Sequence, residues 1–195
     1  MSKKTNEKLI VFLHIPKTAG TCIRDLLNQN FLASEIYDPR SSLGLLEAKD
    51  AQLMLEKKKV LSSHSGVFGG EINGRPLRYF TMLRSPLERV ISFWLHAVRD
   101  PSNVAHEKAI KYSFAEFIEG QFFTDTHNYQ TRLVAGVNSL EGLSESEYLY
   151  KKITETELSI AKENLIGLFD FVGIQEQFYY SFTGISNLLG LPLVG

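Results

Sequence analysis

The pattern of hydrophobic and polar positions at the start of the chain predicts a strand, a tight loop and a helix. Leu9–Leu13 is a continuous apolar run between a charged amino terminus and Pro16. Such a run is typical of a central strand in a parallel sheet, because that strand is buried on both faces. From Thr21 onward the apolar residues recur at helical spacing, at Ile23, Leu26, Leu27 and Phe31.

Strands and helices continue to alternate along the chain. We expect further strands at Val60–Ser63, Tyr79–Leu83 and Phe169–Val172. Further helices are expected at Leu45–Lys58, from Pro86 onward with Ser85 as the N-cap, and at Phe178–Leu189. The helix after Ser85 is expected to bury one apolar stripe, formed by Leu87, Val90, Ile91, Trp94 and Val98.

Residues 101–168 contain no convincing strand, which indicates a mainly helical insertion. Two capping boxes mark helix starts within it, Ser113 with Glu116 and Thr154 with Glu157. Strands that alternate with helices imply a parallel sheet covered by helices on both faces. We therefore expect an α/β protein with a P-loop-like, three-layer fold, in which a central parallel sheet is flanked by helices and carries this insertion.

Composition and charge narrow the possible partners. The chain has 195 residues, 44% hydrophobic and 22% charged, which fits a single domain over residues 1–195. Its 21 basic and 22 acidic side chains leave a net charge of −1, so nucleic acid is not an expected partner and any anion site must be local. The single cysteine, Cys22, favours a reducing compartment. Without a signal peptide or an apolar run long enough for a membrane span, we expect a cytoplasmic protein.

The loop between the first strand and the first helix has the features of an anion site. A tight turn containing Lys17 and Gly20 leads into a helix near Thr21, where free backbone N–H groups and the helix dipole favour an anion. Lys17 adds a positive charge, and Thr18 and Thr21 add hydroxyl donors. The Walker A pattern is absent, because Lys17 precedes the glycine. On these residues alone, an ordinary turn with a surface lysine is an equal alternative.

Four segments resemble a known family. Residues 12–21, FLHIPKTAGT, are similar to the 5′-phosphosulfate loop of the sulfotransferases that use 3′-phosphoadenosine 5′-phosphosulfate (PAPS). Residues 81–92, TMLRSPLERVIS, resemble the strand and helix that bind the nucleotide 3′-phosphate in this family. Residues 128–132, NYQTR, and 171–178, FVGIQEQF, agree with two later segments. The resemblance is to the branch that contains the heparan sulfate 2-O- and 6-O-sulfotransferases and their bacterial relatives.

The resemblance implies a reaction and a donor-binding set. It implies PAPS as sulfuryl donor, adenosine 3′,5′-bisphosphate (PAP) as product, no metal, and a hydroxyl acceptor that is a small molecule or a carbohydrate. The implied donor-binding residues are Pro16, Lys17, Thr18, Ala19, Gly20, Thr21 and Cys22 in the loop, with Arg84 and Ser92 at the 3′-phosphate. Since PAPS has two separate anionic ends, we expect a second pocket made by Arg84, Arg89 and the amino end of the helix after Ser85.

His64 is the expected general base. It follows a predicted strand and precedes a glycine-rich stretch, and an imidazole accepts protons near neutral pH. In the resembling family a histidine at this strand end serves as the catalytic base, and Lys17 would act on the leaving-group side. His96 is the second candidate for the base. His14 is expected to pack within the loop.

Several assignments stay open at this stage. Packing behind the loop competes with donor binding as the role of Cys22. For Asn128, Gln130 and Arg132, acceptor binding, ordering of the nucleotide site and helix packing are alternatives. Family members continue past the last expected helix, so the chain is either a short variant or a fragment that lacks the usual C-terminal segment. A non-catalytic PAP- or PAPS-binding module and a P-loop-type small-molecule kinase are the alternative functions, and the sequence leaves the acceptor's identity and the oligomeric state open.

Overall fold

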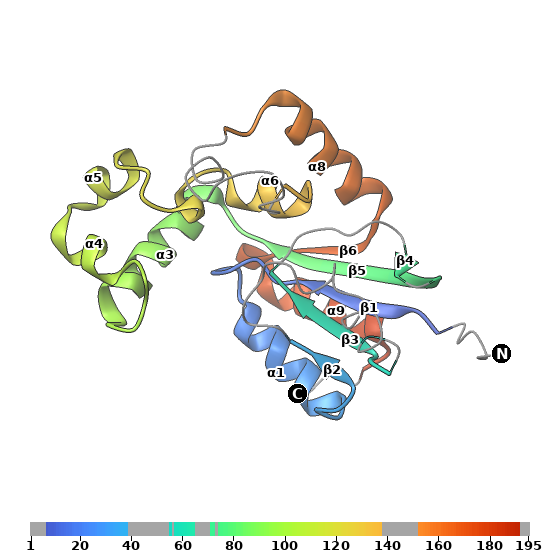
Figure 1. The fold of residues 1–195 in the computed structure, drawn as a ribbon. Helices are drawn as coiled ribbons and strands as arrows, with labels where there is room; N and C mark the ends of the chain where they lie inside the picture. The colour runs from blue at the N-terminus through green and yellow to red at the C-terminus, as the bar shows by residue number, and fades with distance from the viewer. Residues whose placement is uncertain are drawn as a thin grey trace.

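A mainly parallel sheet forms the centre of the computed structural model, which describes residues 7–38, 55, 57–64, 71–72, 74–137 and 152–191. The order of the strands is β2-β3-β1-β5-β4, and β6 also pairs with β5. The strands are β1 (Leu9–Leu13), β2 (Ile36–Tyr37), β3 (Val60–Ser63), β4 (Glu71–Ile72), β5 (Arg75–Leu83) and β6 (Phe169–Ile174). β1 lies between β3 and β5, parallel to both (Figure 1).

The predicted strands are confirmed, and two are longer than expected. β1 is central and almost wholly buried, as its apolar run predicted. β5 begins at Arg75 because β4 pairs antiparallel with its first residues. β6 continues to Ile174, which pairs with Leu83 at the far end of β5.

Helices cover both faces of the sheet, which confirms the three-layer α/β arrangement (Figure 1). On one face, α1 (Gly20–Asn30) and α9 (Phe178–Leu189) pack against a cluster that includes Phe12, Phe80 and Met82. On the other face, α6 (Tyr129–Val134) and α8 (Glu155–Gly167) pack against Val11 and Tyr79. Neighbouring residues of β1 therefore point to opposite layers, as the pleat of a strand requires.

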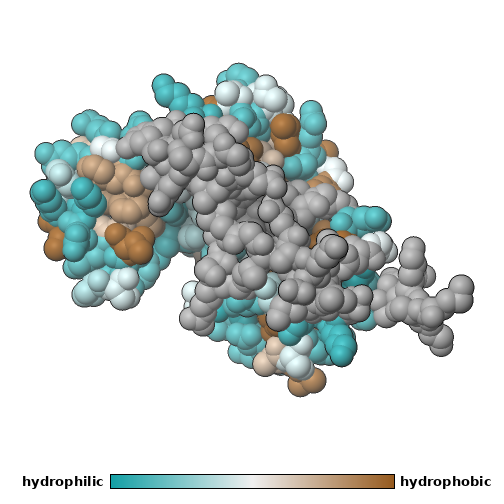
Figure 2. Space-filling model, in the orientation of Figure 1, coloured by the Kyte–Doolittle hydropathy of each residue, from teal (hydrophilic) through white to brown (hydrophobic). Residues whose placement is uncertain are grey.

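A lobe beside the sheet is formed by α3 (Pro86–Arg99), α4 (His106–Lys111) and α5 (Phe114–Glu119) (Figure 1). Its own small core consists of Phe93, Ala97, Ala105, Ala109 and Phe117. The described residues between 101 and 168 form helices joined by turns, with no strand among them, and include the short 3₁₀ turn η1 (Thr124–Thr126), so the mainly helical insertion is confirmed for them. Both predicted capping boxes form. Figure 2 shows apolar side chains among hydrophilic ones on this lobe, where Val104 and Ile110 are exposed.

Two expectations about α3 need correction. Leu87 is 62% exposed, whereas the buried residues are Arg89, Phe93 and Ala97. The cause is tertiary, because α3 leaves the sheet at its first turn and its contacts with α4 and η1 decide which face is covered. Ser85 does occupy the N-cap position, but its side chain caps none of the described backbone groups.

The expected helix Leu45–Lys58 lies almost entirely outside the described residues. In the part of the chain that the structure describes, helices are too short or too polar to cross a membrane.

Arg75 gives a test of how the amino-terminal ends of the strands are held. Its buried guanidinium donates to the backbone carbonyls of Glu7, Lys8 and Lys58. Arg75→Ala leaves these carbonyls without that donor, so we expect the free energy of unfolding in urea to fall by at least about 1.5–3 kcal/mol. Arg99→Ala removes an exposed arginine and should change it by less than about 0.5 kcal/mol. Similar values for both variants would contradict this role.

Candidate functional site

The carboxyl ends of the parallel strands meet at one edge of the sheet. Leu13 pairs with Ser63 of β3 on one side and with Thr81 of β5 on the other. The loop after β1, His64 after β3 and Arg84 after β5 therefore start from neighbouring strands. Ligands of open α/β sheets bind at this edge.

A cavity of about 540 Å³ lies at this edge. It is lined by most of the predicted donor-binding residues, namely Pro16, Lys17, Ala19, Gly20, Thr21, Arg84 and Ser92. We call it the donor cavity. A smaller cavity of about 280 Å³ adjoins it, since Lys17, Arg84, Ser92 and His96 line both. Residues far apart in the sequence are thus brought together as predicted.

Two residues of the predicted set lie away from the donor cavity. Thr18 is fully buried, and its hydroxyl donates to the carbonyl of Ile15 at 2.7 Å, so its side chain stabilises the loop from within. Cys22 is exposed on the first turn of α1 and does not contribute to the described lining of either cavity.

The backbone of the loop is shaped to present N–H groups. Lys17 and Ala19 both have φ of 71°, in the left-handed region that residues with a side chain rarely adopt. Such a conformation costs about 1–2 kcal/mol per residue and turns successive amides toward one concave side. Ala19 is the N-cap of α1 and cannot cap it with its methyl group, and the first turn of α1 has no acidic residue. The first amides of α1 are therefore suited to an anion from outside the helix.

His14 fills the space behind Gly20. A Cβ atom added to Gly20 would lie 1.7 Å from His14 Nε2. The His14 ring stacks on Phe12, with 5.2 Å between centroids, and lies 4.4 Å from the ring of His64. Burial, and then the charges of His64 and Arg24, lower the pKa of His14 to about 3. His14 is thus neutral at physiological pH, and it packs within the loop as expected while also lining the donor cavity.

The two candidate bases differ in their positions. His64 contacts His14 but is not part of the described lining of the donor cavity, and burial lowers its pKa, with a hydrogen bond to the His14 backbone opposing that effect. It is therefore neutral at pH 7, as a base must be. His96 lines both cavities and lies 3.8 Å from Asp100.

Lys17 and Arg84 place two positive charges side by side. Arg84 Nη1 donates to the Lys17 carbonyl at 3.3 Å, and Arg84 Nη2 lies 3.6 Å from a Glu88 carboxylate oxygen. Burial, followed by the charge of Arg84, lowers the pKa of Lys17. Two cations that destabilise each other at a cavity wall form a site that an anion would stabilise.

The backbone of the turn from β5 into α3 is bonded from two directions. The Gln130 side chain accepts from the Arg84 N–H at 2.9 Å and donates to the Arg84 carbonyl at 2.7 Å. Glu176, in the 3₁₀ turn η2 (Gln175–Gln177), accepts from the Ser85 N–H at 2.8 Å. The Ser85 N–H is therefore occupied and is not a donor for the phosphate expected at the amino end of α3. Sequence reasoning missed Glu176, although it lies within the segment 171–178.

Arg89 does not reach the donor cavity. It is only 2% exposed, pairs with Asp125 at 3.6 Å between Nη1 and Oδ1, and lies 5.2 Å from the centroid of the Tyr129 ring. Its expected role at the 3′-phosphate is not supported, because its guanidinium is buried and paired with Asp125, and Arg89 is absent from the described lining of the donor cavity and of the adjoining cavity. Arg132 is also buried and donates to the His127 carbonyl at 3.0 Å, which favours the packing role.

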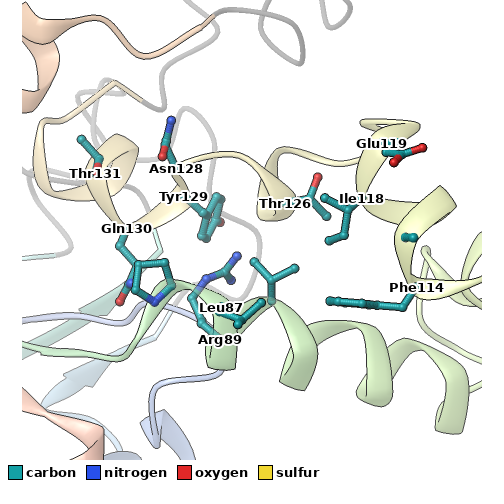
Figure 3. Close-up of a pocket in the computed structure, with 13 residues that line it drawn as sticks. Leu87, Arg89, Phe114, Ile118, Glu119, Thr126, Asn128, Tyr129, Gln130 and Thr131 are labelled. Atoms are coloured by element: carbon teal, nitrogen blue, oxygen red, sulfur yellow. The ribbon is translucent and has the colours of Figure 1, made fainter.

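A separate pocket of about 500 Å³ lies on the other side of α3. Figure 3 shows Leu87, Phe114, Ile118 and Tyr129 around it, with Asn128 at one end. The described lining residues of this pocket and of the donor cavity do not overlap. Its mainly apolar walls are unsuited to a polyanionic nucleotide.

The known proteins to which this chain is similar are sulfotransferases. A family described as "Sulfotransferase family" (Sulfotransfer_2) matches residues 4–188. No curated protein matches the sequence. A sulfotransferase from Alicyclobacillus acidocaldarius is similar in structure, with 15% identity and a TM-score of 0.54, over 96% of this chain and 83% of that one. A mouse sulfotransferase, SULT7A1 complexed with PAP, has 14% identity and a TM-score of 0.49 over 97% of this chain, which spans 60% of the mouse chain.

Gly20 gives a test of the packing behind the loop. Gly20→Ala places a methyl group inside the His14 ring, which Phe12 and His64 restrain, so we expect a loss of about 1–3 kcal/mol in the free energy of unfolding. Gly167→Ala in α8 is the control, because its Cβ meets nothing within 4 Å among the described atoms. It should stabilise the protein by up to about 1 kcal/mol. Urea denaturation measures both, and an unchanged Gly20→Ala would contradict this packing.

Proposed function

The chain belongs to the sulfotransferase family, and on that basis we propose that it transfers a sulfuryl group from PAPS to a hydroxyl acceptor. One observation carries the proposal beyond family membership: Lys17, Arg84 and the amide-rich loop line a single cavity at the strand ends. A chain with a net charge of −1 has concentrated two cations where a dianionic group would sit. PAPS has such a group at each end.

Separate residues bind the two ends of the donor in this proposal. The 5′-phosphosulfate lies on the loop, where Lys17 provides charge and Pro16, Ala19, Gly20 and Thr21 form the wall. The 3′-phosphate lies in the adjoining cavity with Arg84 and Ser92. Thr18 and Cys22 contribute through their backbone only. An arginine suits the 3′-phosphate because its planar guanidinium can donate two parallel hydrogen bonds.

The transfer step uses a base and a cation on opposite sides of the sulfur. The acceptor oxygen forms a bond to sulfur while the bond from sulfur to the 5′-phosphate oxygen breaks, and its electron pair remains on that phosphate. His64 takes the proton that the acceptor hydroxyl loses. Lys17 and the loop amides stabilise the charge that develops on the leaving phosphate. The lowered pKa of His64 keeps its imidazole unprotonated and ready for this role.

The acceptor and the location of the protein are further parts of the proposal. The resemblance to the heparan sulfate sulfotransferase branch favours a carbohydrate hydroxyl, with a small molecule as the other class. The single cysteine favours the cytoplasm.

Calorimetry with PAP, PAPS and ATP, followed by transfer assays with labelled PAPS, tests the proposal. We expect PAP and PAPS to bind and ATP, which has no 3′-phosphate, to bind much more weakly. Binding of PAPS without transfer to any carbohydrate or small-molecule hydroxyl would favour the non-catalytic module. Preferred binding of ATP would favour the kinase alternative and contradict the proposal.

Arg84→Ala tests the 3′-phosphate site. Loss of a charge-assisted hydrogen bond costs about 1.5–3 kcal/mol, so the affinity for PAP should fall by about tenfold or more. The affinity for adenosine 5′-monophosphate, which lacks the 3′-phosphate, should change much less. Arg78→Ala, which removes an arginine outside both cavities, is the control for a general effect of charge. Equal losses for both nucleotides would place Arg84 elsewhere.

Substitutions at Lys17, His64 and His96 separate the catalytic roles. His64→Ala should lower turnover by about 10²–10⁴-fold with PAP affinity nearly unchanged. Lys17→Ala should lower both, because the lysine contacts the donor before and during transfer. Single-turnover rates and PAP titrations provide the two values for each variant. Normal turnover in His64→Ala together with a loss in His96→Ala would move the base to His96.

A further inference from the structure

We infer that Gln130 is a positioning residue for 3′-phosphate recognition, and that Glu176 supports it: together they hold the Arg84–Ser85 turn so that the Arg84 guanidinium is aimed at the nucleotide. This inference rests on the proposed function. It assigns a task to two residues that do not line the donor cavity in the described structure.

Gln130 completes the backbone pairing of Arg84. β5 ends at Leu83, so Arg84 is the first residue beyond the strand. The Gln130 amide accepts from the Arg84 N–H at 2.9 Å and donates to the Arg84 carbonyl at 2.7 Å. Both backbone groups are thus satisfied by one side chain, in the way that a neighbouring strand would satisfy them. Because the two bonds share one planar amide, they fix the position and the orientation of this peptide unit together.

Glu176, in the turn η2, binds the backbone N–H of Ser85, the residue after Arg84. It follows β6, and its carboxylate accepts from the Ser85 N–H at 2.8 Å. The Ser85 side chain caps no described backbone group of α3, and Glu176 satisfies a different donor, the backbone N–H of Ser85 itself, from a distant part of the chain. A carboxylate is also favourable at the positive end of α3. Glu176 is exposed, however, so its bond contributes less than those of Gln130.

The Arg84 side chain is held loosely by comparison with its backbone. Its Nη1 bond to the Lys17 carbonyl is 3.3 Å long, and its Nη2 lies 3.6 Å from Glu88. Its buried Nε has no hydrogen-bond partner in the part of the chain that the structure describes. Because Arg84 lines both cavities and its Nη contacts are long, the guanidinium can still donate to a ligand there. The direction in which its donors point depends on where the turn places the Cα atom.

Gln130→Met tests the inference, because it keeps the length of the side chain and removes both hydrogen bonds. We expect the affinity for PAP to fall about fivefold or more, by calorimetry, with less than a twofold change for adenosine 5′-monophosphate. Gln177→Met replaces an exposed glutamine one residue beyond Glu176 and is the matched control, with both affinities unchanged. A role in stability alone would lower the melting temperature and leave the ratio of the two affinities as in the wild type.

A double-mutant cycle provides the sharper readout. In an Arg84→Ala background, Gln130→Met should lower PAP affinity by less than twofold, because the group that it positions is already absent. Additive losses would show that Gln130 acts independently of Arg84 and would overturn the inference.

Glu176 keeps the inference testable if Gln130→Met does not fold. Glu176→Met should lower PAP affinity about twofold to threefold, and Glu176→Gln should restore it, because an amide oxygen still accepts from the Ser85 N–H. Equal PAP affinities in Glu176→Met, Glu176→Gln and the wild type would contradict the supporting role. A wild-type protein that does not prefer PAP over adenosine 5′-monophosphate would contradict the proposed function itself, whereas a preference that survives Gln130→Met would contradict only the inference.

Discussion

The parallel pairing of β1 with β3 on one side and β5 on the other is the constraint on which the rest of the structure depends. It brings three strand ends, separated by long stretches of chain, to one edge of the sheet. A shift of one residue in either pairing would exchange the faces of the strand, so the two apolar layers hold the register. This register sets the positions of the loop after β1, of His64 after β3 and of the Arg84–Ser85 turn after β5.

The site concentrates unfavourable features that the surrounding fold tolerates. Two residues with side chains adopt left-handed backbone conformations, two cations lie side by side, and a histidine is held neutral against a second histidine. Each costs stability in the folded chain. An anion on the loop would compensate for two of these features, because it would contact the amides of the loop and offset the repulsion between Lys17 and Arg84. A protein that binds its ligand in this way becomes more stable when the ligand is present.

Elements that depend on neighbouring residues could be predicted from the sequence, whereas contacts between residues far apart in the chain could not. β1, α1 and the two capping boxes follow from residues close together in the chain, and the loop carried a recognisable motif. The buried face of α3 and the retreat of Arg89 toward Asp125 depend on how the lobe packs, which periodicity within α3 does not contain. The bonds from Gln130 and Glu176 span 46 and 91 residues, so no local rule could assign them.

α3 lies between two cavities, the donor cavity and the apolar pocket, whose described lining residues do not overlap. One side carries Ser92 and His96 toward the donor cavity, and the other carries Leu87 and Val90 toward the apolar pocket. Leu87, Phe114 and Ile118 line only the apolar pocket, so they can be exchanged without altering a group at the donor cavity, whereas Phe93 belongs to the lobe's core and also lines that cavity. The walls of the apolar pocket can therefore change shape while the residues at the sheet edge keep their chemistry.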